Sequence, residues 1–199
     1  VAYLPGKCFD NGKLTRFGYV TLRAREDNML CKAGEEIPGH EFHHWDCTKP
    51  GAQEYYNSCF DMYAQWGVDF VKIDDLSRPY HTGEIELIRK AIDQCGRPIV
   101  LSISPGETPL DKVDHVKEHA NMWRTVDDFW DNWSQLNYQF QVCAKWAPYI
   151  APGTWPDADM LPLGKISIRG ERGAERWTQF TRDEQYTMMN LWTIFKSPL

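Results

Sequence analysis

The sequence predicts an α/β fold, an incomplete (β/α)8 barrel, from three observations. From residue 50 onward, strand-like apolar runs alternate with amphipathic segments at steps of about 25–30 residues, as in parallel βα units. Polar side chains follow the end of each predicted strand, where the side chains of a barrel face one pocket. No glycine-rich phosphate motif follows any strand, which disfavours a doubly wound nucleotide-binding sheet, the other closure open to this pattern.

Hydrophobic periodicity supports each element in chain order. Apolar residues at three- and four-residue steps, such as Ile85, Ile88 and Ile92, predict helices, and Gly67 and Gly96 are typical stop signals. The predicted helices cover 52–66, 83–95, 109–119 and 130–146, and a last one follows its cap Thr181. The predicted strands cover 69–74, 97–104 and 122–126, with a further candidate over 17–23, whereas 34–39 and 153–159 are expected to be loops.

Several predicted helix faces are specified by residue. The first helix is expected to present Tyr55, Tyr56, Cys59, Phe60, Tyr63 and Trp66. The helix over 130–146 is expected to present Trp133, Leu136, Phe140, Cys143 and Ala147. Cys59, Cys95 and Cys143 fall on apolar helical positions, so we expect buried free thiols there. One disulfide among Cys8, Cys31 and Cys47 remains open.

Composition excludes several classes of protein. The 199 residues carry a formal charge of −6, which argues against a nucleic-acid surface held by phosphate contacts. No apolar run approaches the roughly 18 residues of a membrane helix. No metal or organic cofactor is expected: adjacent His43 and His44 would face opposite sides of a strand, and His81 and His115 stand alone in the sequence.

Carboxylates at the strand ends suggest chemistry. Asp74 ends the first strand of the predicted barrel, Ser104 the second and Asp128 the third. Two carboxylates facing one cleft are what glycoside hydrolysis requires, one as the nucleophile and one as the acid. Lys72, on the same face as Asp74, is expected to keep that carboxylate ionised. The alternative is that each aspartate caps the helix that follows it.

The surroundings of Asp128 carry two further expectations. Asp127 lies beside it, and apolar walls from Trp123, Phe129 and Trp130 would suit an acid partner. Trp123 and Trp130, together with Trp155, are also expected to cluster around the cleft.

Three motifs together resemble one family. They are Gly-Val-Asp-Phe-Val-Lys-Ile-Asp-Asp over 67–75, Trp-Arg-Thr-Val-Asp-Asp-Phe-Trp-Asp-Asn-Trp over 123–133, and Trp-Pro-Asp-Ala-Asp-Met-Leu over 155–161. In this order they resemble glycoside hydrolase family 27, the α-galactosidase and α-N-acetylgalactosaminidase family. The resemblance runs over residues 49–199, and the segment 183–199 is similar to the family's penultimate barrel helix.

The resemblance implies a retaining double displacement on a (β/α)8 barrel, with no cofactor and a small carbohydrate as substrate. It assigns the nucleophile to Asp74 and the acid/base to Asp128 rather than Asp127. It assigns sugar contacts to Lys72 and Arg124, and places Asp159 near the cleft. Asp131 and Trp133 are interpreted as structural.

The identity of the sugar remains open at this stage. Terminal α-galactose is the first hypothesis, and an α-N-acetylgalactosaminide or a β-L-arabinopyranoside is the alternative. A protein that binds sugar without cleaving it is a further one. The small Ser104 stands where many of the family's α-galactosidases carry Cys-Glu-Trp or Cys-Asp-Trp, so it would leave room at the sugar's 2-position unless the Pro-Gly loop after it takes another path.

The length also predicts how the chain is organised. A full barrel takes about 250 residues, so we expect residues 49–199 to be part of one catalytic domain. Residues 1–48 stay unassigned. The family's Asp-Asp pair, which binds the 4- and 6-hydroxyls of the sugar, is not found among them. The first barrel strands, the last strand and a C-terminal β-domain are expected to be absent. Such a piece is expected to be poorly stable, with unpaired sheet edges. A secreted, periplasmic or lysosome-like compartment is typical of the family.

Overall fold

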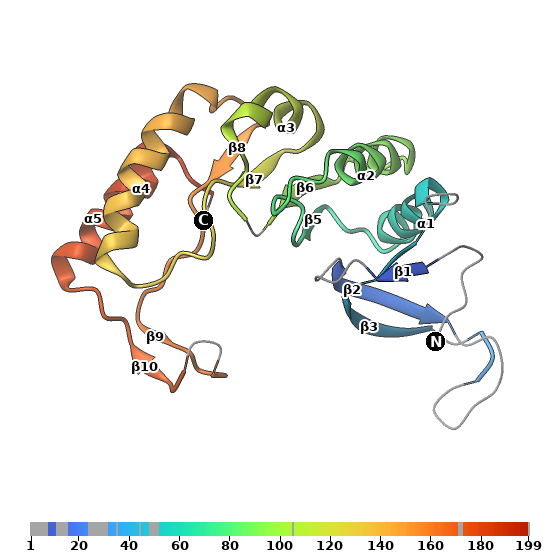
Figure 1. Ribbon diagram of the computed structural model, residues 1–199, viewed down its shortest axis with the longest axis horizontal. Helices are drawn as coiled ribbons and strands as arrows, with labels where there is room; N and C mark the ends of the chain where they lie inside the picture. The colour runs from blue at the N-terminus through green and yellow to red at the C-terminus, as the bar shows by residue number, and fades with distance from the viewer. Residues whose placement is uncertain are drawn as a thin grey trace.

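The computed structural model describes residues 8–10, 16–23, 32–34, 36–43, 45–47, 52–104, 106–170 and 173–198. Its first part contains two antiparallel strand pairs (Figure 1). β1 (Cys8–Asp10) pairs with β4 (Trp45–Cys47), and the register places Cys8 opposite Cys47. β2 (Arg16–Arg23) pairs with β3 (Glu36–His43).

This first part confirms one expectation and corrects another. The strand predicted over 17–23 is present as β2. The loop predicted over 34–39 is wrong from residue 36 onward, because backbone pairing with β2 extends along the whole of β3. Pro38 and Gly39 are weak strand formers, which explains why the sequence suggested a loop. His44, one of the adjacent histidines considered above, lies outside the described residues.

From residue 52 onward the chain alternates helices and strands, as predicted. The helices are α1 (Ala52–Gln65), α2 (Thr82–Gln94), α3 (Val113–His119), α4 (Trp133–Trp146) and α5 (Arg182–Phe195), with short 3-10 turns η1 (Leu110–Lys112) and η2 (Ala147–Tyr149). The strands are β5 (Phe70–Ile73), β6 (Val100–Ile103), β7 (Met122–Arg124), β8 (Trp155–Asp157), β9 (Lys165–Ile166) and β10 (Arg176–Trp177). Within the described helices, none is long and apolar enough to cross a membrane.

Four of these strands form one parallel sheet in the order β5-β6-β7-β8. Each strand lies beside the next one in the chain, and the order does not reverse, whereas a doubly wound sheet has a point where it does. Helices lie along the convex upper side of the arc in Figure 1, with the strands beneath them. This order favours a barrel segment over an open sheet.

The hydrophobic core lies between this sheet and its helices. Leu101, Ile103 and Trp123 on the strands are fully buried, and they pack in one cluster with Ile85 and Ile88 of α2. Because side chains alternate along a strand, the residues between them face the other side of the sheet. That inner side carries the polar residues of the candidate site.

The segment 153–159 was predicted to be a loop, and this is wrong. β8 lies inside it and pairs in parallel with β7 through Met122–Trp155, Trp123–Pro156 and Arg124–Asp157. A proline within a run argues against a strand, because it cannot donate to the ladder. Here β8 ends the order of the four-stranded sheet, so the proline meets only one neighbouring strand of that sheet.

Two predicted helix faces are only partly buried. On α4 the buried residues are Leu136, Gln139, Val142, Cys143 and Trp146, while Trp133 and Phe140 are exposed. On α1 only Phe60 is buried, while Tyr55 on this helix and Trp66 directly after it are exposed. Aromatic residues at helical spacing therefore extended the predicted core too far. Cys143 is buried, and Cys59 and Cys95 are half-buried, and all three are free.

Candidate active site

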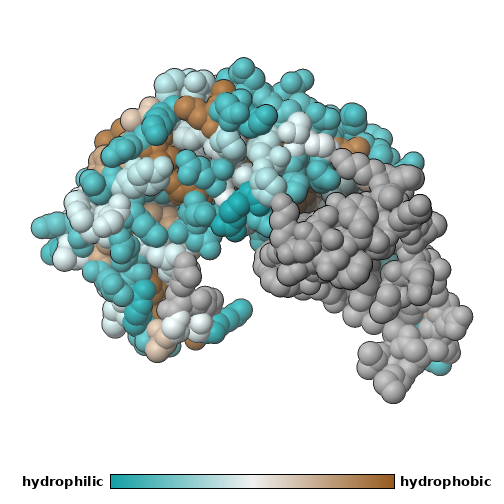
Figure 2. Space-filling model, in the orientation of Figure 1, coloured by the Kyte–Doolittle hydropathy of each residue, from teal (hydrophilic) through white to brown (hydrophobic). Residues whose placement is uncertain are grey.

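The pairing register of the four parallel strands places one residue from each strand end side by side. Asp74, Ser104, Arg124 and Asp157 stand at the carboxyl edge of the parallel sheet, and we call this line the site row. Lys72 lies two residues before Asp74 and therefore on the same face of β5. Hydrophilic residues gather at the centre of the hollowed lower side of the molecule in Figure 2, near the ends of β6 and β7 in Figure 1.

Arg124 is the centre of the polar contacts in the site row. Its side chain is only 3% exposed, and its Nη1 lies 2.7 Å from Asp159 Oδ1. The same Nη1 donates to Ser104 Oγ at 3.3 Å, and Nη2 donates to Asp128 Oδ1 at 3.2 Å. One buried guanidinium thus contacts residues that follow three different strands, and it fixes their side chains relative to each other.

Asp74 lies half-buried beside this guanidinium. Burial raises the pKa of its carboxyl group above the ordinary value, while the charges of Lys72 and Arg124 lower it and those of Asp128 and Asp75 raise it. Lys72 thus acts in the direction that was expected of it, since its charge lowers the pKa of Asp74, but burial has the larger effect on that pKa. The charge of Asp128 therefore acts on the carboxyl group of Asp74.

Asp128 and Asp127 turn in different directions. Asp128 faces Arg124, and its side chain is 52% exposed. Asp127 pairs instead with Arg78, with Arg78 Nη1 2.7 Å from its Oδ1, and both of those side chains are about 60% exposed. The geometry thus brings Asp128, and not its neighbour, into the polar network of the site row.

Two of the three residues expected to form apolar walls around Asp128, Trp123 and Phe129, belong to the hydrophobic core instead. Trp123 is fully buried and packs against Trp146, with ring centroids 5.9 Å apart. Phe129 packs against Trp192 at 5.0 Å, on the helix side of the sheet. Of the tryptophans expected at the cleft, Trp155 is partly exposed on the inner face of β8, whereas Trp123 belongs to the core.

Asp159 pairs with Arg124, and Asp157 in turn binds Asp159. Asp159 is buried, accepts from the Phe129 N–H at 2.6 Å, and has a left-handed backbone with φ of 80°. Its own N–H donates to Asp157 Oδ1 at 2.7 Å, and its carbonyl accepts from Trp192 Nε1 at 2.9 Å. Burial raises the pKa of both carboxyl groups, and the nearby Arg124 charge opposes that rise.

Asp157 is the residue of this group that sequence reasoning missed. It ends β8, a strand that was taken for a loop, so its place in the site row was hidden. The signal was present, since Asp157 precedes Asp159 by two residues and would share its face of an extended strand.

The loop that carries Asp128 is fixed at its far end by Asp131. That carboxylate is 3% exposed and pairs with Arg176, whose Nη2 donates to Asp131 Oδ1 at 2.8 Å and whose Nη1 contacts Oδ2. The Gln179 N–H donates to Oδ2 at 2.6 Å. Burial alone would raise the pKa of Asp131, but these bonds hold it below its ordinary value. The structural interpretation of Asp131 agrees with these contacts.

Comparison with known proteins identifies relatives of this chain. The family model described as Alpha galactosidase A (Melibiase_2) matches residues 40–199. A crystal structure of a variant β-L-arabinopyranosidase of glycoside hydrolase family 27 from Geobacillus stearothermophilus, in complex with arabinose, is 54% identical in sequence. Its TM-score is 0.72, and the match covers 87% of this chain and 41% of that one.

A second solved structure and a plant protein are also similar to this chain. A Bacillus halodurans protein named as a candidate alpha-N-acetylgalactosaminidase is 55% identical, with a TM-score of 0.61, over 80% of this chain and 39% of that one. Alpha-galactosidase 3 from Arabidopsis thaliana is 31% identical over 96% of this chain and 39% of its own length. The chain thus spans about two fifths of the length of these relatives. The four-stranded parallel sheet is part of a (β/α)8 barrel, as the sequence predicted.

Proposed function

The chain belongs to glycoside hydrolase family 27, and on that premise we propose that it forms part of the active site of a retaining exo-glycosidase acting on terminal α-galactose or a sugar of the same ring configuration. Asp74 is the nucleophile and Asp128 the acid/base. The observation that carries the proposal is their shared environment, since both interact electrostatically across one sheet edge around Arg124.

The reaction proceeds in two displacements at the anomeric carbon. A carboxylate oxygen of Asp74 attacks that carbon, and the bond to the leaving oxygen breaks as Asp128 donates a proton to it. Water then attacks the glycosyl ester, Asp128 takes a proton from the water, and the Asp74 carboxylate leaves. Two inversions give net retention.

The charges around the two carboxylates suit this cycle. Partial burial of Asp74 removes water from its carboxylate, and Lys72 and Arg124 supply positive charge beside it. When Asp74 is esterified its negative charge disappears, so the two carboxyl groups no longer repel each other in the second step. Asp128 is half exposed and can therefore exchange its proton with solvent between the two steps.

The remaining predicted sugar contacts divide into two groups. Lys72 is exposed on the inner face and is free to reach a hydroxyl. Arg124, Ser104 and Asp159 are all buried, and Arg124 contacts both of the others, so we assign to these three residues the shaping of the pocket floor. Asp159 then acts by orienting Arg124, and it need not touch the sugar itself.

A second candidate concerns which sugar is cleaved. The identities of 54% to a β-L-arabinopyranosidase and of 55% to a candidate alpha-N-acetylgalactosaminidase both exceed the 31% to the plant α-galactosidase, so the substrates of both proteins are candidates. The β-L-arabinopyranoside has the ring configuration of α-D-galactose without the C6 hydroxymethyl group. The small, buried Ser104 also keeps α-N-acetylgalactosaminides as a candidate, because its size would leave room at the 2-position.

A panel of nitrophenyl α-galactoside, α-N-acetylgalactosaminide and β-L-arabinopyranoside tests the substrate with the full protein that carries this chain. We expect turnover of at least one of the three. Binding of these sugars without any turnover would contradict the enzymatic proposal and support a carbohydrate-binding protein.

Azide rescue tests the two roles separately. With Asp74→Gly, azide is expected to restore turnover and give a glycosyl azide of inverted configuration. With Asp128→Gly, the rescued azide should have retained configuration, because Asp74 still forms the ester. Asp127→Gly is the matched control and should keep near wild-type turnover. Reversed azide configurations would show that the two roles are exchanged.

A further inference from the structure

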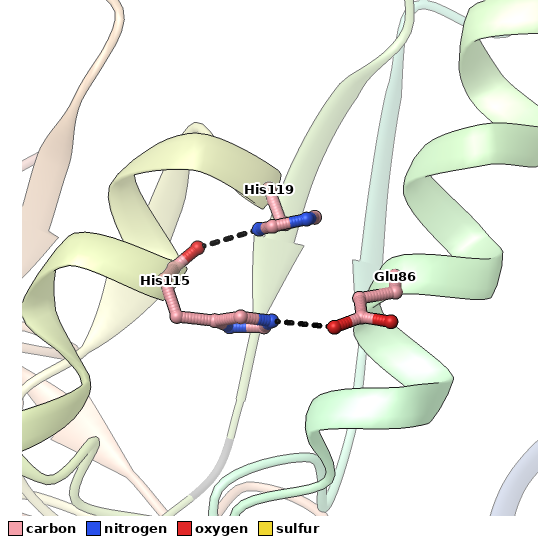
Figure 3. Close-up of side chains that lie close together, drawn as sticks. All are labelled: Glu86, His115 and His119. Atoms are coloured by element: carbon pink, nitrogen blue, oxygen red, sulfur yellow. Dashed lines mark hydrogen bonds and ion pairs between the residues drawn. The ribbon is translucent and has the colours of Figure 1, made fainter.

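A second cluster of ionisable side chains lies on the helical side of the barrel segment. Glu86 extends from α2, and His115 and His119 extend from α3, one helical turn apart and therefore on one face (Figure 3). The sequence suggested that His115 stood alone, and this is wrong. Its ring stacks on that of His119 with centroids 4.2 Å apart.

We propose that Glu86, His115 and His119 form a binding site for a divalent transition-metal ion, with Zn²⁺ as the best fit. One carboxylate oxygen of Glu86 and Nε2 of each histidine would be the ligands. In the structure each of the three residues offers one ligand atom, a ring nitrogen or a carboxylate oxygen, and these atoms lie within 4.8 Å of one another. Two imidazoles with one carboxylate are a donor set that suits Zn²⁺, with water in the fourth position.

The hydrogen bonds of the imidazoles define which nitrogens are available. His119 Nδ1 lies 2.8 Å from the His115 carbonyl oxygen, which can only accept, so Nδ1 carries the proton. In the neutral ring the lone pair is then on Nε2. His115 Nδ1 lies 2.7 Å from the Tyr80 hydroxyl, whose oxygen can accept the Nδ1 proton, which again leaves Nε2 for a metal.

His115 Nε2 is itself an unusual atom. It is buried, and none of the described residues gives it a hydrogen bond. The nearest carboxylate oxygen, Glu86 Oε1, lies 3.5 Å away, which is long for a hydrogen bond. Two ligands of a tetrahedral zinc ion with bonds of about 2.1 Å stand about 3.4 Å apart. The observed separation therefore fits two atoms that flank an ion.

Space for the third ligand lies on the His119 side. A metal ion lies close to the plane of each imidazole that binds it, and the two rings are now nearly parallel, with an angle of 17° between them. His119 must therefore turn out of this stack when an ion binds, and its Nδ1 then exchanges the bond to the His115 carbonyl for one to water. It faces an open cavity of about 380 Å³ that Glu86, Asp93 and Glu118 also line, so there is room to turn.

The nearby cations do not neutralise the cluster. Arg89 lines the same cavity, but its Nε and Nη2 both bind Asp93, at 2.9 and 2.6 Å. Lys90 also lines the cavity and is exposed, so its ammonium group keeps its water. A bound ion would join α2 to α3 on the helical side of the sheet, away from the site row. The site is thus independent of the proposed hydrolysis.

Titration of the metal-free full protein with Zn²⁺ by calorimetry tests the proposal. We expect one ion per chain with a dissociation constant of about a micromolar or tighter. Co²⁺ should give the visible absorption of a tetrahedral nitrogen- and oxygen-ligated ion. His119→Gln and Glu86→Gln should each weaken Zn²⁺ binding at least about tenfold and remove the Co²⁺ band.

His81→Gln is the matched control, because His81 also lies close to a glutamate of α2, with Nδ1 3.8 Å from Glu84 Oε2, but without a second histidine. It should leave Zn²⁺ affinity unchanged. Tyr80→Phe keeps all three ligands and removes the partner of His115 Nδ1, so binding should weaken by about 10- to 100-fold. Absence of saturable Zn²⁺ binding, or equal binding by wild type, His119→Gln and Glu86→Gln, would overturn the proposal.

Discussion

Two aspartates flank Asp128 in one loop and offer a matched pair of substitutions. Asp127 and Asp131 both pair with an arginine, but the Asp127 side chain is 60% exposed and that of Asp131 is 3% exposed. Asp131→Asn and Asp127→Asn each remove one negative charge with almost no change in shape. The difference between the two variants therefore isolates the effect of burial.

The expected magnitudes follow from the contacts. Asp131 accepts two bonds from Arg176 and one from the Gln179 N–H, and hydrogen bonds to charged groups contribute about 1.5–3 kcal/mol each when buried. Arg176 regains water when the pair breaks, so we expect a total loss of about 2–3 kcal/mol in the free energy of unfolding. Asp127→Asn breaks a solvated ion pair and should cost less than about 1 kcal/mol.

The pH dependence gives a second measure of the same interaction. Because the pKa of Asp131 is lowered in the folded protein, its contribution is fully present above the ordinary carboxyl pKa of 3.8 and is lost as pH falls through the lowered value. Urea unfolding should therefore show the full gap between wild type and Asp131→Asn at pH 7, and a shrinking gap below pH 3.8. Loosening the loop should also lower kcat, by up to about a hundredfold.

Equal losses of stability in the two variants would refute this reasoning. So would a gap between wild type and Asp131→Asn that is independent of pH.

Three further outcomes are expected. Lys72→Met removes a cation that lowers the pKa of Asp74, so the acid limb of the pH profile of kcat/KM should move to higher pH. An acid limb that does not move would contradict the assignment of Asp74 as the nucleophile. Burial raises the pKa of the Cys143 thiol to about 12, so disulfide reagents at pH 8 should label this thiol only after unfolding. Labelling is detected by mass spectrometry, and rapid labelling of the native protein would argue against the burial of Cys143. Thr181→Ala removes half of the capping box formed with Glu184 at the start of α5, so it should lower the free energy of unfolding by about 1 kcal/mol. Urea unfolding measures this loss, and no change would show that the cap is dispensable.

Locally encoded features were predictable from the sequence. The buried face of α2 followed from the spacing of Ile85, Ile88 and Ile92, and the start of α5 from Thr181 and its acidic first turn. The polar residues at the ends of β5, β6 and β7 were also identified, because a parallel strand leaves its carboxyl end at one edge of the sheet. Each of these signals lies within a few residues of the feature that it predicts.

Features that depend on distant packing could not be predicted. β8 has three residues and contains Pro156, and it is a strand because β7 offers it a ladder. Trp133 and Phe140 have helical spacing, but other segments decide which side of α4 is covered. The pKa of Asp74 depends on how far burial outweighs Lys72, and no sequence pattern measures that balance.

His115 and His119 stack because they lie one turn apart on the same helix, α3. The approach of Glu86 to this pair depends instead on how α2 packs beside α3. Spacing within α3 could therefore have suggested the histidine pair, whereas the third member of the cluster required the fold.

The site row also determines where this chain can change in length. Side chains alternate along a strand, so one residue added or deleted within Phe70–Ile73 would turn Asp74 from the inner face of the sheet toward the helices. The same alternation decides which face of the sheet Arg124 in β7 and Asp157 in β8 occupy. Insertions that begin and end within the connections before these strands do not change the face that these side chains occupy. Natural length variation among relatives should therefore be concentrated in those connections, and grafting experiments that exchange whole connections should preserve the alignment of the reacting groups.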